Sequence, residues 1–183
     1  MVRGRQIRFD RDALNAYLGN PLHLPPHTIC AYSEVLAKKN WPIENIAKHL
    51  FIEGRSFDCN ARGHVIRVTR DNLAVPAQVI LLLIVYNLKP KSHTSTATMD
   101  RVTLLWYILV GLQVDIARVI SNEMKRIAES GIKNDSKPII SYPGLIMGLC
   151  SDARAVLPAY VSETIDGPIN DTYIERHCKN KKV

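Results

Sequence analysis

The longest run of helix-like periodicity lies at residues 99–130. Apolar side chains recur there at steps of three and four residues, while charged and amide side chains follow the opposite side. The apolar set is Leu105, Leu109, Leu112, Ile116, Val119, Ile120 and Ile127. The pattern predicts one long amphipathic helix, with Asp100 as its N-cap or first-turn carboxylate and Gly131 just past its end.

A second apolar segment precedes this helix and is predicted to pack on it. Residues 104–112 are apolar on all sides and need neighbours, and residues 79–86 are the only other segment apolar enough to cover them. Thr69 is a suitable N-cap for this segment, and Pro76 is tolerated only near a helix start. Its β-branched residues also allow a strand, but residues 73–88 are long for one, so we predict a helix over residues 71–88.

Two short β-like runs, at residues 56–59 and 64–68, flank a four-residue loop with turn residues at both ends. They predict a β-hairpin. Shorter helices are predicted at residues 11–18, 28–39, 42–53 and 143–154. The fold class is therefore α+β, mainly α, with one domain over residues 1–158 and a polar, basic C-terminal tail over residues 159–183.

Length and composition agree with one globular domain. The 183 residues are 46% hydrophobic and 22% charged. Crossing a bilayer takes roughly 20 consecutive apolar residues, and the apolar runs at residues 79–86 and 104–112 are shorter than that. We find no secretory signal at the N-terminus. We therefore expect an intracellular protein, nuclear or cytoplasmic, with no membrane partner.

The net charge and the positions of the cysteines exclude few classes of function. The formal net charge of +7 favours polyanionic partners weakly. The four cysteines lie far apart and predict free thiols. Zinc would need clustered Cys and His, and pairs such as His177 with Cys178 do not supply a full ligand set. We expect neither a metal nor a cofactor.

The densest basic region surrounds the predicted hairpin. It contains Lys48, Arg55, Arg62, Arg67 and Arg70. A phosphate backbone could lie across such a ribbon, each contact adding salt-dependent affinity. The simpler interpretation is a solvated hairpin face, because no aromatic residues interleave to stack on bases.

The polar segment at residues 89–98 joins the two predicted core helices. His93 lies between hydroxyl residues, so Ser92 or Ser95 as nucleophile and Asp100 as orienting group would make a hydrolase-like site. Neighbours in sequence do not guarantee the required geometry. A Ser-rich turn whose hydroxyls cap the next helix explains the same residues.

Three blocks resemble a known plant family. Residues 3–10 with 13–21 form the first, residues 87–95 followed by Asp100 and Arg101 the second, and residues 142–150 the third. In this order they resemble the "putative plant transposon protein" domain over residues 2–158. The resemblance implies a mobile-element-derived domain without a settled activity, with a motif loop formed by Ser92, His93, Thr94, Ser95, Asp100 and Arg101.

The chain departs from that family in two ways. Members usually carry sequence upstream of the first block, and often a tryptophan where this chain has residues 80–84, Ile-Leu-Leu-Leu-Ile. We therefore expect a copy shortened at its N-terminus. Loss of an N-terminal element would expose an apolar patch and favour self-association.

A transposase core would require three carboxylates on a multistranded sheet to hold two metal ions. Asp58, Asp71, Asp100 and Asp115 fall instead on a hairpin edge and on helices, so we reject a nuclease core. The main hypothesis is a non-catalytic domain that contacts nucleic acid or another protein. The alternatives are the hydrolase-like enzyme, a protein assembly module without nucleic acid, and a decayed copy without selected function.

Overall fold

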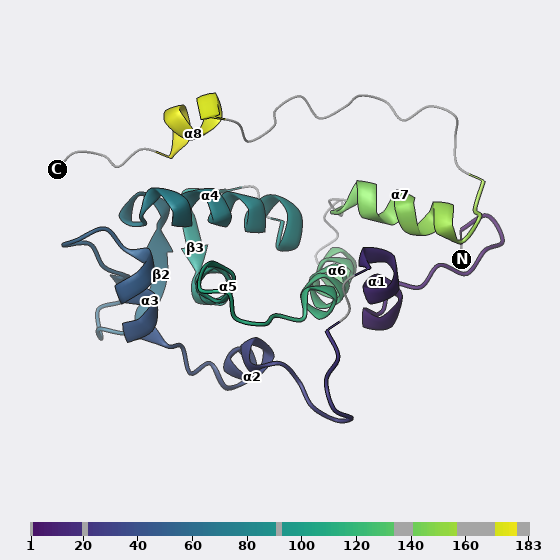
Figure 1. Ribbon diagram of the computed structural model, residues 1–183, viewed down its shortest axis with the longest axis horizontal. Helices are drawn as coiled ribbons and strands as arrows, with labels where there is room; N and C mark the ends of the chain where they lie inside the picture. Colours follow the sequence, from purple (N-terminus) through teal and green to yellow (C-terminus); the bar gives the residue numbers. More distant parts are fainter. Residues whose placement is uncertain (1, 20–21, 91–92, 134–140, 157–170, 179–183) are drawn as a thin grey trace. The chain divides into compact units, whose positions relative to one another are not determined.

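The computed structural model describes residues 2–19, 22–90, 93–133, 141–156 and 171–178 (Figure 1). The chain forms two compact units. One combines Met1–Pro21 with Ile116–Gly167, and the other combines Leu22–Asp115 with Pro168–Val183. We call them the smaller and the larger unit and describe each by itself. Helices dominate the described residues, beside a three-stranded antiparallel sheet, so the predicted α+β, mainly α class is confirmed.

Helix α5 (Met99–Leu109) forms the centre of the larger unit. Helix α4 (Val75–Leu83) packs across it, as Figure 1 shows with α5 viewed nearly end-on. Helices α2 (Ala31–Lys38) and α3 (Ile43–Leu50) also contact α5. The fully buried side chains at this contact region include Leu50, Leu73, Leu81, Leu82, Leu104 and Leu105. The predicted packing of the two apolar segments is confirmed.

The sheet has the order β1-β2-β3, with strands β1 (Asp58–Cys59), β2 (Val65–Thr69) and β3 (Thr96–Thr98). The predicted hairpin is β1 and β2. Asn60 closes its loop, because its Oδ1 accepts hydrogen bonds from the backbone N–H groups of Arg62 (2.9 Å) and His64 (3.0 Å). Strand β3 was not predicted, because residues 89–98 have the composition of a polar connection.

The prediction of one helix over residues 99–130 is wrong. Helix α5 ends at Leu109, and α6 (Ile116–Lys133) begins after a break in which Gly111 has φ 73°. A positive φ is a conformation that glycine adopts without the steric cost of a Cβ. The helix break leaves Leu109 and Leu112 exposed, although the periodicity placed both on the apolar seam. Gly131 lies inside α6 rather than past its end.

The second predicted core helix, residues 71–88, is also divided. A 3₁₀ turn, η1 (Arg70–Asn72), follows Thr69, and α4 then carries Pro76 in its first turn. Between them the chain is extended, because the N–H of Ala74 donates to the carbonyl of Leu50 (2.8 Å). A π-helical segment, η2 (Ile84–Leu88), continues α4. Helix rather than strand is therefore confirmed for the apolar core of this segment.

The smaller unit contains α1 (Arg11–Leu18), α6 and α7 (Pro143–Asp152). Asp10 caps α1 by accepting hydrogen bonds from the N–H groups of residues 12 and 13, and Gly19 ends it with φ 66°. Leu14 is fully buried, and α1 packs on α6. The predicted bounds of α1 are confirmed, and α7 ends two residues before the predicted limit.

One described helix was not predicted. Helix α8 (Asp171–His177) lies in the segment predicted to be a polar C-terminal tail, and it belongs to the larger unit. The sequence also predicts a polar break at residues 133–137 and an extended entry to the next helix at residues 139–140. All of these residues except Lys133, the last residue of α6, lie outside the described residues. None of the described helices has the length and apolar character that a membrane span requires.

Candidate functional site

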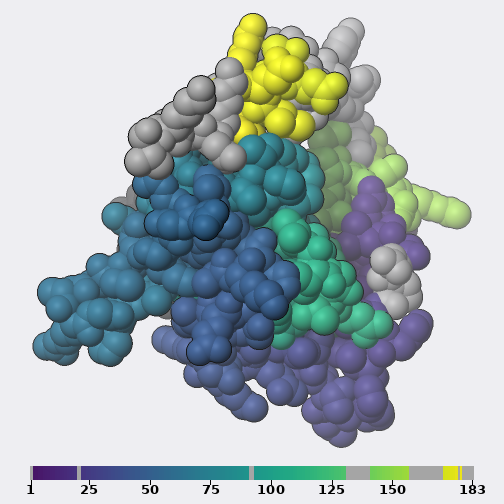
Figure 2. Space-filling model, turned by 60° about the vertical axis from the view of Figure 1, so that its left-hand side comes forward, coloured from purple at the N-terminus to yellow at the C-terminus, as the bar shows by residue number. Residues whose placement is uncertain are grey.

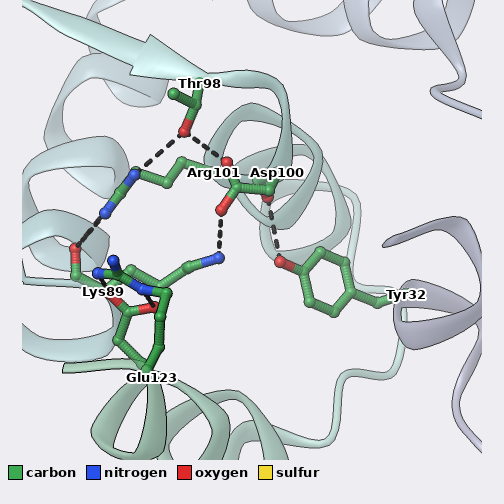
Figure 3. Close-up of polar contacts among 7 residues, drawn as sticks. Tyr32, Lys89, Thr98, Asp100, Arg101 and Glu123 are labelled. Carbon is green, nitrogen blue, oxygen red and sulfur yellow. Dashed lines mark hydrogen bonds and ion pairs between the residues drawn. The ribbon is translucent and has the colours of Figure 1, made fainter. Parts of the chain in front are cut away.

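A network of charged side chains lies at the start of α5, where the motif loop of the sequence analysis ends (Figure 3). The carboxylate of Asp100 forms an ion pair with the Nζ of Lys89, and both residues are largely shielded from solvent. The hydroxyl of Thr98, the N-cap residue of α5, donates to the other oxygen of Asp100. The carboxylate also lies in the first helical turn, where unpaired N–H groups favour negative charge.

Arg101 joins the same network from the neighbouring helical position. Its Nη1 donates to the Thr98 hydroxyl (3.1 Å), and its Nε and Nη2 approach the carbonyl of Lys89 (3.4 Å each). The hydroxyl of Tyr32 on α2 donates to the carbonyl of Asp100 (3.1 Å). The network therefore ties the end of η2, the end of β3 and α2 to the first turn of α5 (Figure 3).

The electrostatics of Asp100 follow from these partners. Burial by itself would raise the pKa of this carboxyl, since it penalises the charged form. The charge and hydrogen bond of Lys89, the hydroxyl of Thr98 and the charge of Arg101 outweigh that effect and hold the pKa below its ordinary value. The carboxylate is therefore ionised at neutral pH.

The motif loop is thus partly structural. Asp100 and Arg101 meet in the network, whereas His93 and Ser95 are exposed and Thr94 is half-buried. The backbone carbonyl of Ser95 accepts a hydrogen bond from the N–H of Arg70 (2.8 Å). Ser92 lies outside the described residues.

The hydrolase-like alternative needs a carboxylate to orient His93. Asp100 was the candidate, and its two oxygens are occupied by Lys89 and Thr98. Among the described residues, none of the hydrogen bonds or ion pairs found joins His93 to a carboxylate. The geometry therefore gives this alternative no positive support.

The predicted nucleic-acid contacts lie on several elements of the larger unit. Arg62 is in the hairpin loop, Arg67 on β2, Lys48 on α3 and Arg55 just before β1, and all four side chains are exposed. Figure 2 shows the hairpin, in steel blue at the left, projecting from the larger unit. We call residues 58–69 the basic hairpin.

Two of the five predicted cations interact with other side chains of the fold. Arg67 forms an ion pair with Asp58 across the β1–β2 ladder (3.2 Å), and the hydroxyl of Thr69 donates to the same carboxylate (2.9 Å). Arg70, in η1, is half-buried, and its charge acts on Tyr173 and Cys178 of the C-terminal segment. The exposed set therefore consists of Lys48, Arg55, Arg62 and Arg67.

Two members of the network, Lys89 and Tyr32, were not predicted. Lys89 lies in the polar connection at residues 89–98, and Tyr32 lies within the helix predicted at residues 28–39. The only signal in the sequence was the family-like spacing of Lys89 and Asp100 around the Ser-His-Thr block. Their meeting depends on β3 folding back beside β2, which periodicity does not report.

The described residues give little support for disulfide or metal chemistry. The four cysteines are free thiols, with Cys30, Cys150 and Cys178 buried and Cys59 exposed. Across the described ranges, no group of three or more His, Cys, Asp or Glu side chains gathers where a metal ion could be held.

The fold and these features define a small, mainly helical α+β protein with an internal charged network and an exposed basic hairpin. A family model described as "Putative plant retrotransposon-related domain" matches residues 1–156, and the chain belongs to this family. The predicted membership in a plant family derived from mobile elements is thereby confirmed. No curated protein and no solved structure matches the chain.

Proposed function

We propose that this chain is a non-catalytic interaction domain that contacts nucleic acid through the basic hairpin. The observation that carries the proposal is the position of Arg62 and Arg67. Both are exposed on a hairpin that projects from the larger unit (Figure 2). A projecting ribbon of this kind can reach a phosphate backbone without rearrangement of the helices behind it.

The neighbouring side chains define what kind of contact is expected. Phe57, next to the hairpin, packs edge-on against Phe51 with ring centroids 4.7 Å apart, so it is already used within the fold. Base stacking is therefore not part of the proposal. Contacts to phosphates fix position but carry no sequence information, so we propose binding with little sequence preference.

The ion pair between Arg67 and Asp58 does not prevent such a contact. The Arg67 side chain is more than half exposed, and exposed pairs contribute little free energy because water and salt screen them. A phosphate can therefore compete with Asp58, which keeps its hydrogen bond from Thr69.

The test compares two double variants that lose the same charge. Arg62→Ala/Arg67→Ala removes two cations from the basic hairpin, and Lys38→Ala/Lys125→Ala removes two exposed cations that pair with glutamates on α2 and α6. Fluorescence anisotropy at low salt measures binding to labelled single-stranded and duplex DNA. We expect about tenfold weaker binding for the hairpin variant and little change for the control. Equal losses would reject the hairpin as the site.

A protein-assembly function is supported by a different observation. Leu83 and Tyr86, at the end of α4 and in η2, remain 41% and 51% exposed. Large apolar side chains that gather at an exposed surface are typical of protein contacts.

A further inference from the structure

Helix α8 lies beside α4 in both views of the molecule (Figures 1 and 2), and both helices belong to the larger unit. It is amphipathic. Ile174 is half-buried and Cys178 only 2% exposed, whereas Thr172, Glu175 and Arg176 face solvent. The N–H of Cys178 donates to the carbonyl of Ile174 (2.8 Å), which extends the helical geometry to the buried thiol.

The surface under α8 is formed by Arg70 and Tyr86. A hydrogen bond joins the side chains of Tyr173 and Tyr86, and the charge of Arg70 acts on both Tyr173 and Cys178. Tyr86 and Leu83 are separated by three positions, which brings their side chains near each other on a helix. Both remain substantially exposed with α8 in place, so the surface extends beyond the area that α8 covers.

The fit between α8 and this surface is incomplete. The Nε of Arg70 is buried and has no hydrogen-bond partner among the described residues. A buried donor without a partner costs free energy, and a carboxylate is the acceptor that an arginine binds most strongly. The group near Arg70 is instead the Cys178 thiol. Burial raises the pKa of this thiol and the charge of Arg70 offsets only part of that rise, so the thiol is neutral at neutral pH.

Two further observations indicate that another helix could replace α8 on this surface. The family model matches residues 1–156, so Arg70 and Tyr86 belong to the family domain and α8 lies beyond it. An isolated helix of seven residues is marginal in water, so the helical state of α8 depends on its docking.

We propose that Arg70, Leu83 and Tyr86 form a docking site for a short amphipathic helix, which α8 occupies in cis. A partner helix with a carboxylate at the position of Cys178 would fill the same site better, because it would complete the hydrogen bonding of Arg70. The C-terminal segment then controls how much of the site is offered to a partner. This site is separate from the basic hairpin and does not depend on nucleic-acid binding.

The experiment uses the full chain and labelled synthetic peptides. Tyr173→Ala/Ile174→Ala removes the inner face of α8 and opens the site. The probes carry the sequence of residues 168–183 with Cys178→Ser or Cys178→Asp. We expect the opened chain to bind both peptides at least about tenfold more tightly than wild type, and the aspartate peptide about tenfold more tightly than the serine peptide. Arg70→Gln in the opened chain should remove the aspartate advantage.

A second measurement covers the case in which the opened chain does not fold, as judged by circular dichroism. In the Cys59→Ser chain, excess aspartate peptide should displace α8 and raise the rate at which a thiol reagent labels Cys178, with the serine peptide less effective. Equal peptide binding by wild type and a folded opened chain would overturn the proposal. So would equal binding of the two peptides, or a labelling rate that neither peptide changes.

Discussion

Asp100 illustrates how a residue that looks functional in the sequence can serve the fold. Its carboxylate accepts hydrogen bonds from Lys89 and Thr98. Arg101 completes the network by donating to the Thr98 hydroxyl and the carbonyl of Lys89. Buried and half-buried charges are tolerated when each has partners, and removal of one partner leaves the others unpaired. Asp100 and Arg101, from the second family-like block, therefore contribute to the stability of the fold.

Asp100→Asn should lower the free energy of unfolding by about 3 kcal/mol at pH 7, because it leaves Lys89 buried without its counter-charge. The pKa of Asp100 is lowered in the folded state, so its contribution is full above the unfolded pKa, about 3.9, and is lost as pH falls through the folded value. The difference between wild type and variant should thus shrink in acid. Urea unfolding at several pH values measures this.

His93→Ala is the matched control within the same loop. His93 is exposed, so the substitution should change the free energy of unfolding by less than about 0.5 kcal/mol. A large effect of His93→Ala, or an Asp100→Asn effect that is constant down to low pH, would contradict the assignment of the network.

At the scale of elements, periodicity identified which segments are helical but not where the helices break. The apolar pattern continues through residues 110–115, whereas the backbone turns at Gly111. One glycine in an apolar run is a weak signal, because glycine is also tolerated inside helices at a modest cost. Strand β3 was missed for another reason: its pairing with β2 is non-local, and its Thr-Ala-Thr sequence resembles the polar loop before it.

Gly111→Ala should lower the free energy of unfolding by about 1 kcal/mol, because a Cβ is disfavoured at φ 73° while the surrounding space is open. Gly111→Asn should cost less, since asparagine tolerates this conformation better than other residues with a Cβ. Thermal unfolding of the two variants tests the break. A stabilised alanine variant would instead favour a continuous helix.

Two glycines of α7 provide a matched pair in the smaller unit. A Cβ at Gly148 would overlap the ring of Tyr17 on α1, whereas a Cβ at Gly144 meets open space. Gly144→Ala should therefore stabilise the chain by about 0.5 kcal/mol, and Gly148→Ala should destabilise it by about 1 kcal/mol. In a Tyr17→Ala background the Gly148→Ala penalty should disappear, which a double-mutant cycle measures.

For the whole molecule, the class of fold and the family followed from the pattern and from three sequence blocks. The candidate sites could be predicted only in part from the sequence. Arg62 and Arg67 were predicted as exposed hairpin cations, and their exposure is confirmed, while nucleic-acid binding stays a prediction. Arg70 was grouped with them because it is near in sequence, but its Nε lies buried and its charge acts on the α8 segment. Arg70 and the α8 segment are about a hundred residues apart in the chain, so the local sequence around Arg70 cannot predict this contact.

The salt dependence of DNA binding tests the central claim most directly. Each phosphate contact releases counterions, so the slope of log K against log salt reports the number of contacts. Relative to wild type, Arg62→Ala/Arg67→Ala should reduce the steepness by about 1.8 on duplex DNA and about 1.4 on single strands. The control variant Lys38→Ala/Lys125→Ala should keep the wild-type slope. Two results would contradict the account. One is that the folded chain does not bind DNA at low salt, and the other is that the hairpin variant has the same slope as wild type.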